Sequence, residues 1–270
     1  MSKCAAIQMA SGPSVSSNLT EAGRLIGEAV NAGAKLVVLP ENFALMGEHE
    51  LDKLKVKEKD GTGPIQDFLA ETALKHGIWV VGGTIPLAGD QENKVRASSL
   101  VYNDKGERAG RYDKIHLFDV AVPDTEEVYR ESNSIEQGDS PVVIDTPFGK
   151  LGLSVCYDLR FPEFYRKLVA LGAEILLVPS AFTAQTGAAH WETLLRARAI
   201  ENLAYVIAPN QGGFHINGRK TYGHSMIIDP WGLILDCYKT GGGFVCAEID
   251  HERLAKVRSS FPVLHHRRFD

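Results

Sequence analysis

Cys156 is the residue of this sequence best suited to nucleophilic catalysis. It directly follows the apolar stretch 151–155. It also begins the polar run CYDLR, which leads to Pro162. This pattern predicts a buried strand that ends at the cysteine and a helix soon after it, the place where open α/β sheets bind ligands. Backbone N–H groups there can stabilise an anion. A cysteine after a strand can also be a small buried apolar residue, an interpretation that we favour for the other three, Cys4, Cys237 and Cys246.

Glu41 is a candidate base for this thiol, which needs activation because it is mostly protonated at neutral pH. It follows the apolar run LVVLP, just as Ser180 follows LLVP later in the chain. Since both positions end a strand, Glu41 could face Cys156 and accept its proton. For Glu41 taken alone, a solvated loop carboxylate is the simpler interpretation.

The segment RYDKIHLFDV, residues 111–120, adds two more candidates. Lys114 stands among apolar and aromatic residues, where burial is costly without a negative partner, and it could stabilise a tetrahedral oxyanion. The alternative is a surface lysine whose charged end reaches solvent. His116 could instead be the base of a papain-like Cys–His pair, as could His190.

An internal repeat indicates how residues so far apart could meet. GAKLVVLP at 33–40 and GAEILLVP at 172–179 each stand between two helix-like stretches, and a second strand and a hairpin with Gly in its turn follow. The expected helices are 19–31, 63–76, 162–170 and 190–201, and the expected later strands are 77–83, 99–106, 107–112, 202–210, 225–232 and 233–237.

These strands are short and almost continuously apolar, which suits sheets that are buried on both faces. Two such halves could bury their sheets against each other. We therefore expect an α/β fold, a four-layer αββα sandwich, in a single domain spanning residues 1–270. One doubly wound sheet, with strands that match by chance, is the alternative.

Composition and charge exclude several classes of protein. The chain has 270 residues, 44% of them hydrophobic, and a net charge of −5, so it has no basic patch for nucleic acid or a membrane surface. Its apolar runs are too short to span a bilayer. The N-terminus lacks the continuous apolar core of a signal peptide and the cysteines lack CxxC spacing, so we expect a cytoplasmic protein. Without metal-binding or phosphate-binding motifs, no metal and no cofactor are expected.

Three motifs together resemble those of a known family. LPENF at 39–43, YDKIHLF at 112–118 and SVCYDLRFPE at 154–163 match, in order and spacing, the Glu, Lys and Cys motifs of the nitrilase superfamily of carbon–nitrogen hydrolases. The resemblance extends over nearly the whole chain, from AAIQMA near the N-terminus to HHRR near the C-terminus. It implies an αββα sandwich with an internal pseudo-twofold.

The resemblance also implies roles for individual residues. Glu41 would be the general base and later the general acid, and Cys156 would form the acyl-enzyme. Lys114 and the backbone N–H of Tyr157 would hold the oxyanion. The family uses a second Glu in the loop that corresponds to 122–139, which we match to Glu131, and the alternatives in that loop are Glu126, Glu127 and Glu136.

Two further segments, 180–202 and 222–232, resemble the amidases of this superfamily that hydrolyse deaminated glutathione and release α-ketoglutarate. A substrate with carboxylates needs cationic or amide donors, and Arg160, four residues after the nucleophile, is the best placed. Thr186, His190 and Trp191, expected in a loop before the next helix, could shape the pocket. Packing in the core or in an interface is an equal alternative for Trp191.

Other branches with the same catalytic residues remain open: ω-amidases acting on α-ketoglutaramate, N-carbamoyl amino acid hydrolases and nitrilases. A catalytically silent scaffold is the non-enzymatic alternative. The expected partners are a small amide, water and further copies of the chain, with no nucleic acid and no membrane. The homo-oligomer would be a dimer or tetramer, and the helix at 161–165 and the tail 259–270 would form part of its interface.

Overall fold

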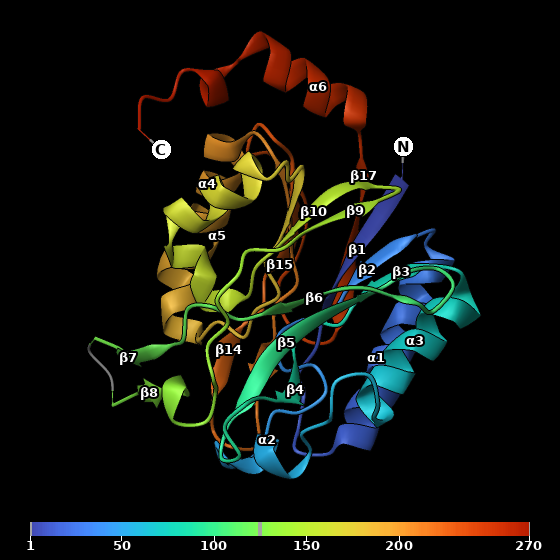
Figure 1. The fold of residues 1–270 in the computed structure, drawn as a ribbon, viewed down its shortest axis with the longest axis vertical. Coiled ribbons are helices and arrows are strands. Elements are labelled where there is room, and N and C mark those ends of the chain that lie inside the picture. The colour runs from blue at the N-terminus through green and yellow to red at the C-terminus, as the bar shows by residue number, and fades with distance from the viewer. Residues whose placement is uncertain (1, 124–125, 270) are drawn as a thin grey trace.

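The computed structural model describes residues 2–123 and 126–269, and its strands form two mixed sheets that lie face to face (Figure 1). In the first sheet three parallel strands are flanked by antiparallel ones, in the order β17-β1-β2-β3-β5-β4, and β6 pairs with β5. The strands are β1 (Ser2–Gln8), β2 (Leu36–Val38), β3 (Trp79–Val81), β4 (Ile85–Ala88), β5 (Val95–Tyr102), β6 (Arg108–Asp113) and β17 (Gly243–Ile249).

The second sheet repeats this arrangement in the order β16-β15-β12-β11-β10-β9. Its members are β9 (Val143–Thr146), β10 (Gly149–Leu153), β11 (Ile175–Leu177), β12 (Tyr205–Ala208), β15 (Ser225–Ile228) and β16 (Ile234–Tyr238). The parallel strands β10, β11 and β12 are followed by the antiparallel β15 and β16, as β1, β2 and β3 are followed by β5 and β6. The predicted internal repeat and the αββα fold are confirmed.

Helices cover the outer face of each sheet (Figure 1). The first sheet carries α1 (Val15–Asn31) and α3 (Pro64–His76), and the second carries α4 (Pro162–Ala170) and α5 (Ala184–Asn202). The short α2 (Asp52–Lys55) and the C-terminal α6 (His251–Ser260) lie at opposite ends of the sandwich. Outside the two sheets, β7 (Asp119–Ala121) pairs with β8 (Val128–Arg130), and β13 (Gly212–Phe214) pairs with β14 (Lys220–Tyr222).

The start of α5 corrects one expectation. Its N-cap is Thr183, whose hydroxyl accepts a hydrogen bond from the Thr186 N–H, so the helix begins at Ala184 and not at 190. Thr186 therefore lies in the helix and not in the predicted loop, and His190 and Trp191 lie within the helix and not at its entrance. The capping threonine precedes the small residues that open the helix, which carry little of the apolar periodicity on which the prediction rested.

Side chains of successive residues in β1 show why the strands are apolar throughout. Cys4 and Ala6 belong to the core between the two sheets, whereas Ala5 and Ile7 pack with α1 and α3. Both faces of the strand are thus buried, as the four-layer arrangement requires.

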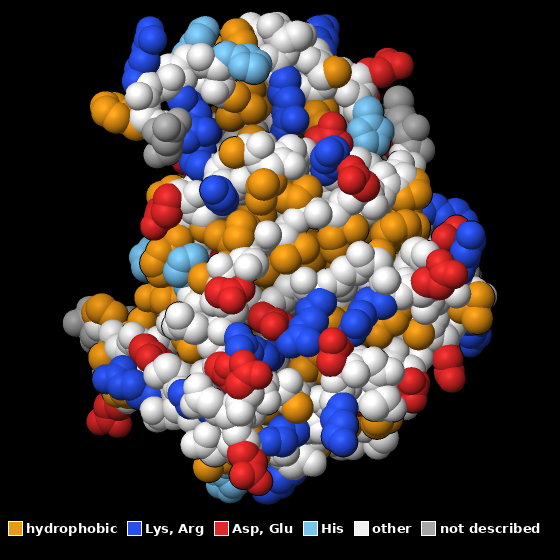
Figure 2. Space-filling model, viewed as in Figure 1, with side chains coloured by type: hydrophobic (Ala, Val, Ile, Leu, Met, Phe, Trp, Pro, Cys, Tyr) orange, Lys and Arg blue, Asp and Glu red, His pale blue; other side chains and the backbone are white. Residues whose placement is uncertain are grey.

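The surface in the same view shows where the two sheets meet (Figure 2). Hydrophobic side chains form a band across the middle of this face, along the seam between the β5–β6 and β9–β10 hairpins, with charged side chains above and below it. None of the helices in residues 2–123 and 126–269 combines the length and the hydrophobicity that a membrane span requires.

Candidate active site

Cys156 lies at a cavity of about 580 Å³ whose lining also includes Glu41, Lys114 and Glu131. The walls come from both halves of the chain: the segments after β2 and β3, helix α2, the β7–β8 hairpin and the turn before β14. The four residues predicted to be catalytic are therefore brought to one place.

The backbone at Cys156 is held in an unusual conformation. The residue begins a short 3₁₀ helix (Cys156–Arg160) soon after β10, and its φ of 47° lies in the left-handed region that non-glycine residues rarely adopt. Its N–H donates to Pro179 O at 2.9 Å. Among the described residues, the next N–H, that of Tyr157, has no hydrogen-bond acceptor, so it can donate to a substrate oxygen.

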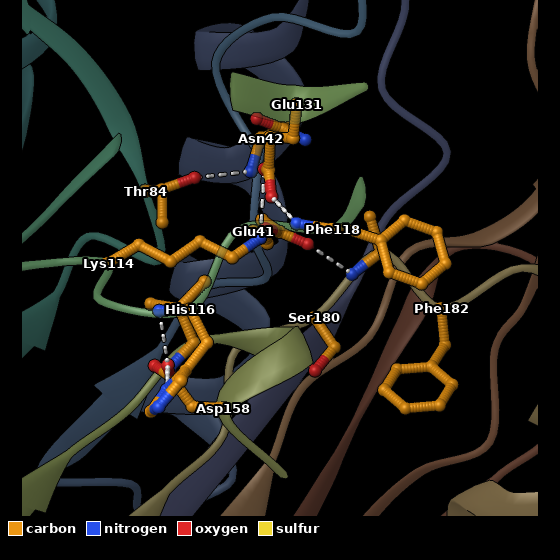
Figure 3. A network of polar contacts seen from close by, with 12 residues as sticks. Glu41, Asn42, Thr84, Lys114, His116, Phe118, Glu131, Asp158, Ser180 and Phe182 are labelled. Atoms are coloured by element: carbon orange, nitrogen blue, oxygen red, sulfur yellow. Dashed lines mark hydrogen bonds and ion pairs between the residues drawn. The ribbon is translucent and has the colours of Figure 1, made fainter. Parts of the chain in front are cut away.

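The buried carboxylate of Asp158 holds this turn through hydrogen bonds. Asp158 Oδ2 accepts from Val155 N–H at 2.8 Å and from the Tyr112 hydroxyl at 2.6 Å. Its Oδ1 accepts from His116 N–H at 3.1 Å and lies 2.7 Å from His116 Nδ1 (Figure 3). The His116 ring also stacks on Phe161, with centroids 3.7 Å apart. His116 is thus engaged in holding Asp158, and this placement does not favour a Cys–His pair.

Lys114 is the centre of the ionic cluster (Figure 3). Its Nζ donates to Glu41 Oε1 at 2.7 Å and to Glu131 Oε1 at 2.9 Å. The second oxygen of each carboxylate accepts a backbone N–H, Glu41 from Ala181 at 2.9 Å and Glu131 from Phe118 at 2.7 Å. Lys114 is only 1% exposed and Glu41 3% exposed, so the lysine is the paired, buried cation that the sequence suggested and not a surface lysine.

The charges of the cluster follow from its burial. Burial alone would lower the pKa of Lys114, but Glu131 and Glu41 outweigh it and hold the pKa well above its usual value. Burial alone would raise the pKa of Glu131, but the positive charge of Lys114 outweighs burial and lowers this pKa. Burial raises the pKa of Cys156, and the Glu41 charge raises it further. Cys156 is therefore expected to be a thiol at rest, so an attack by its sulfur would need a base.

The other acidic residues considered for the second carboxylate lie elsewhere. Glu126 is exposed and Glu127 is half-buried, where it accepts from the Tyr129 hydroxyl; both line the cavity at its outer part. Glu136 pairs with Arg96 and does not line the cavity. Of the acidic residues 126, 127, 131 and 136, Glu131 is thus the one in contact with Lys114.

Arg160 and His190, two of the predicted substrate-binding residues, pair with each other next to the 3₁₀ helix that begins at Cys156. The Arg160 guanidinium lies 5.2 Å from the centroid of the Phe182 ring, and its Nη1 is 3.2 Å from Nδ1 of His190, which is exposed. Neither Arg160 nor His190 is among the residues that line the cavity.

Thr186 and Trp191, also predicted to shape the pocket, lie in α5 and have structural contacts. Thr186 lies in its first turn, bonded to the capping Thr183. Trp191 is fully buried, donates its indole N–H to His224 O at 2.8 Å and packs on Phe182. Its position is that of a core residue, the alternative that the sequence left open.

Lys53 and Arg219 line the cavity but were not singled out from the sequence. Lys53 belongs to the charged run LDKLKVKEKD and Arg219 stands next to Lys220, the usual pattern of surface charge, so no local signal distinguishes them. Among residues 2–123 and 126–269, no cluster of three or more His, Cys, Asp or Glu side chains could hold a metal ion.

Comparison with known proteins identifies similar chains. A family model described as carbon–nitrogen hydrolase matches residues 3–259. A deaminated glutathione amidase of Synechocystis is 47% identical over 98% of this chain and 97% of its own. The Caenorhabditis elegans NitFhit protein matches with a TM-score of 0.91 and 36% identity over 99% of this chain, which spans 65% of that longer one. Yeast Nit3, a member of branch 10 of the nitrilase superfamily, matches with a TM-score of 0.89 and 32% identity, over 99% of this chain and 97% of its own.

Proposed function

Because this chain belongs to the carbon–nitrogen hydrolase family, we propose that its site hydrolyses the amide bond of deaminated glutathione through a thioester at Cys156. The resemblance stated from the motifs is confirmed, and the protein is an amidase of this family. The substrate is proposed because the Synechocystis relative, similar over almost its whole length, is a deaminated glutathione amidase.

The observation that carries the chemistry is the pairing of Lys114 with two carboxylates beside a buried thiol. Glu41 takes the proton of Cys156 as Sγ attacks the amide carbonyl carbon. The carbonyl oxygen becomes an oxyanion, which accepts hydrogen bonds from Lys114 Nζ and Tyr157 N–H. Glu131 keeps Lys114 charged and directed at this oxygen.

Collapse of the tetrahedral intermediate breaks the C–N bond, and Glu41 donates its proton to the leaving amine. A water molecule then enters and loses a proton to Glu41 as it attacks the thioester carbonyl. Cleavage of the C–S bond releases α-ketoglutarate, and the sulfur regains its proton from Glu41. The thiol and the carboxylate are restored, so no cofactor is required.

Initial rates on three substrates separate this proposal from an ω-amidase and from a nitrilase. We expect kcat/KM to be highest for deaminated glutathione, measured as released α-ketoglutarate, lower for α-ketoglutaramate and lowest for a nitrile of similar size. Preference for α-ketoglutaramate would support an ω-amidase, and preference for the nitrile would overturn the proposed substrate.

We further propose that the protein acts in the cytoplasm as a dimer or tetramer. The four thiols are free, which suits a reducing compartment. Large apolar side chains near the C-terminus are exposed, Phe261 at 48% and Phe269 at 89%, and Phe261 packs edge-on against the half-exposed Trp231. Burial of this surface against a second copy would remove it from water.

A further inference from the structure

We propose that Lys53 and Arg219 each bind one carboxylate of a doubly anionic substrate, one on either side of the amide that is cut. This inference rests on the proposed function and adds the residues that would select the substrate. Both side chains line the cavity that contains Cys156. They come from separate parts of the chain, α2 in the first half and the turn before β14 in the second.

The charges next to the nucleophile make such cations necessary. Glu41 and Glu131 share a single ammonium group, that of Lys114, so this cluster has an excess of negative charge. An anionic substrate that approached Cys156 would be repelled unless other cations lay in the cavity. The remaining acidic residues of the lining, Glu48, Glu50, Glu126 and Glu127, are exposed or half-buried, where solvent and salt screen them.

Lys53 is a cation whose ion pair with Glu50 is long and lies at the surface. Its Nζ donates to Ser134 Oγ at 3.1 Å, and Glu50, the carboxylate with which it forms an ion pair, lies 3.7 Å away and is exposed. The side chain is 25% exposed, so it is accessible from the cavity. Burial lowers the pKa of Lys53 despite the nearby acidic groups, and a substrate carboxylate would offset that effect.

Arg219 is held in place by contacts that, among residues 2–123 and 126–269, include no ion pair with a carboxylate. Its Nη2 donates to Ala181 O at 2.5 Å, and its guanidinium lies 5.2 Å from the centroid of the Tyr129 ring. Its Nε is buried and has no hydrogen-bond partner in the described part of the chain. Since Ala181 also donates its N–H to Glu41, Arg219 is fixed to the residue that positions the base. Arg219 lines the cavity, so its guanidinium can donate to a substrate carboxylate there.

The substrate has the matching chemistry. Deaminated glutathione has one carboxylate on its α-keto acid, which stays with the acyl group, and another on its glycine, which leaves with the amine. α-Ketoglutaramate has the first only. A cation that binds the keto-acid carboxylate would therefore contribute with both substrates. A cation that binds the glycine carboxylate would contribute with deaminated glutathione alone.

The test compares Lys53→Met and Arg219→Met on deaminated glutathione, on the same amide with both carboxylates blocked as methyl esters, and on α-ketoglutaramate. We expect each variant to lower kcat/KM for deaminated glutathione by about 10- to 100-fold, mainly through KM, the loss expected for a hydrogen bond to a charged group. The rate on the diester should stay at the wild-type level. One variant, and not the other, should impair α-ketoglutaramate.

Matched controls are Lys55→Met on α2 and Lys220→Met beside Arg219, which remove equal charge from residues outside the cavity lining. The charge-conserving Lys53→Arg and Arg219→Lys should recover part of the rate. Equal losses on charged and blocked substrates would show a structural role and overturn the proposal, as would unchanged KM for deaminated glutathione. Impairment of α-ketoglutaramate by both variants, or by neither, would overturn the assignment of one carboxylate to each cation.

Failure of the proposed function gives a different result. In that case the wild-type protein would not cut deaminated glutathione, and the two variants would be compared on whichever ω-amide it does cut, with and without its carboxylate. Loss restricted to the anionic amide would still support the two cations.

Discussion

Lys114 Nζ and Glu41 Oε1 lie 2.7 Å apart although 73 residues separate them in the sequence. The first follows β6 and the second follows β2, both in the first sheet, while Cys156 follows β10 in the second. The face-to-face packing of the two sheets therefore brings the proposed base, the buried cation and the proposed nucleophile into one cavity. The contact also explains how a lysine can be almost fully buried and remain charged.

We predict that Glu41→Gln and Glu131→Gln differ in severity. Glu41→Gln removes the base and should lower kcat by about 10²- to 10⁴-fold. Glu131→Gln leaves the base but weakens the hold on Lys114, and kcat should fall by about 10- to 10³-fold with little change in KM. Steady-state kinetics on deaminated glutathione measures both, with Glu126→Gln at the rim as the control. Wild-type kcat in Glu131→Gln would remove this residue from the site.

Alkylation of Cys156 should depend on pH in a way that reveals Glu41. Burial raises the pKa of this thiol and the Glu41 charge adds to the shift, so the thiolate fraction is small at neutral pH and grows as pH rises. The rate with iodoacetamide should keep increasing above the ordinary thiol pKa of about 8.5. Glu41→Gln removes a negative charge, lowers the pKa and should move the curve to lower pH, whereas the exposed Glu192→Gln should not. A wild-type plateau below neutral pH would contradict the assignment, because it would indicate a preformed thiolate.

His116→Asn should leave most of the activity in place, with kcat within about tenfold of the wild type, since the ring holds Asp158 and we propose Glu41 as the base. Loss of the stack on Phe161 should lower the free energy of unfolding by roughly 1–2 kcal/mol, measured by urea denaturation. Abolished activity in a folded His116→Asn would revive the Cys–His alternative.

Deletion of residues 259–270 should weaken self-association, because it removes Phe261 and Phe269 from the exposed apolar surface. Sedimentation velocity over a range of concentrations would show a shift toward the monomer. The substitution Leu74→Asp on α3, an exposed apolar residue away from this tail, serves as the control. An unchanged oligomer after the deletion would exclude the tail from the interface.

Much of the fold could be predicted because strands buried on both faces leave continuous apolar runs. The repeat of such runs in 33–40 and 172–179 indicated two equivalent sheets, and α4 was predicted with its observed bounds. The start of α5 was not, because Thr183 sets it through a cap and not through apolar periodicity. Capping threonines are common in loops too, so the signal is weak in sequence alone.

The candidate site was predictable to the extent that its residues follow strands. Cys156, Glu41 and Lys114 stand at the ends of recognisable strands, so topology alone could bring them together. Lys53 and Arg219 lie in short segments whose place depends on side-chain packing, and the long-range contact of Arg219 with Ala181 leaves no trace in local sequence. The contacts between His116 and Asp158, 42 positions apart in the sequence, are equally non-local.

The central claim, acyl transfer through a thioester on Cys156, is tested most directly by intact-protein mass spectrometry. Wild-type protein mixed with deaminated glutathione and quenched with acid during turnover should gain the mass of one α-ketoglutaryl group, and peptide mapping should place it on Cys156. Cys156→Ala should gain nothing, and Cys237→Ser should behave as the wild type. Turnover with no adduct on the wild-type protein, or an adduct that persists in Cys156→Ala, would contradict the account.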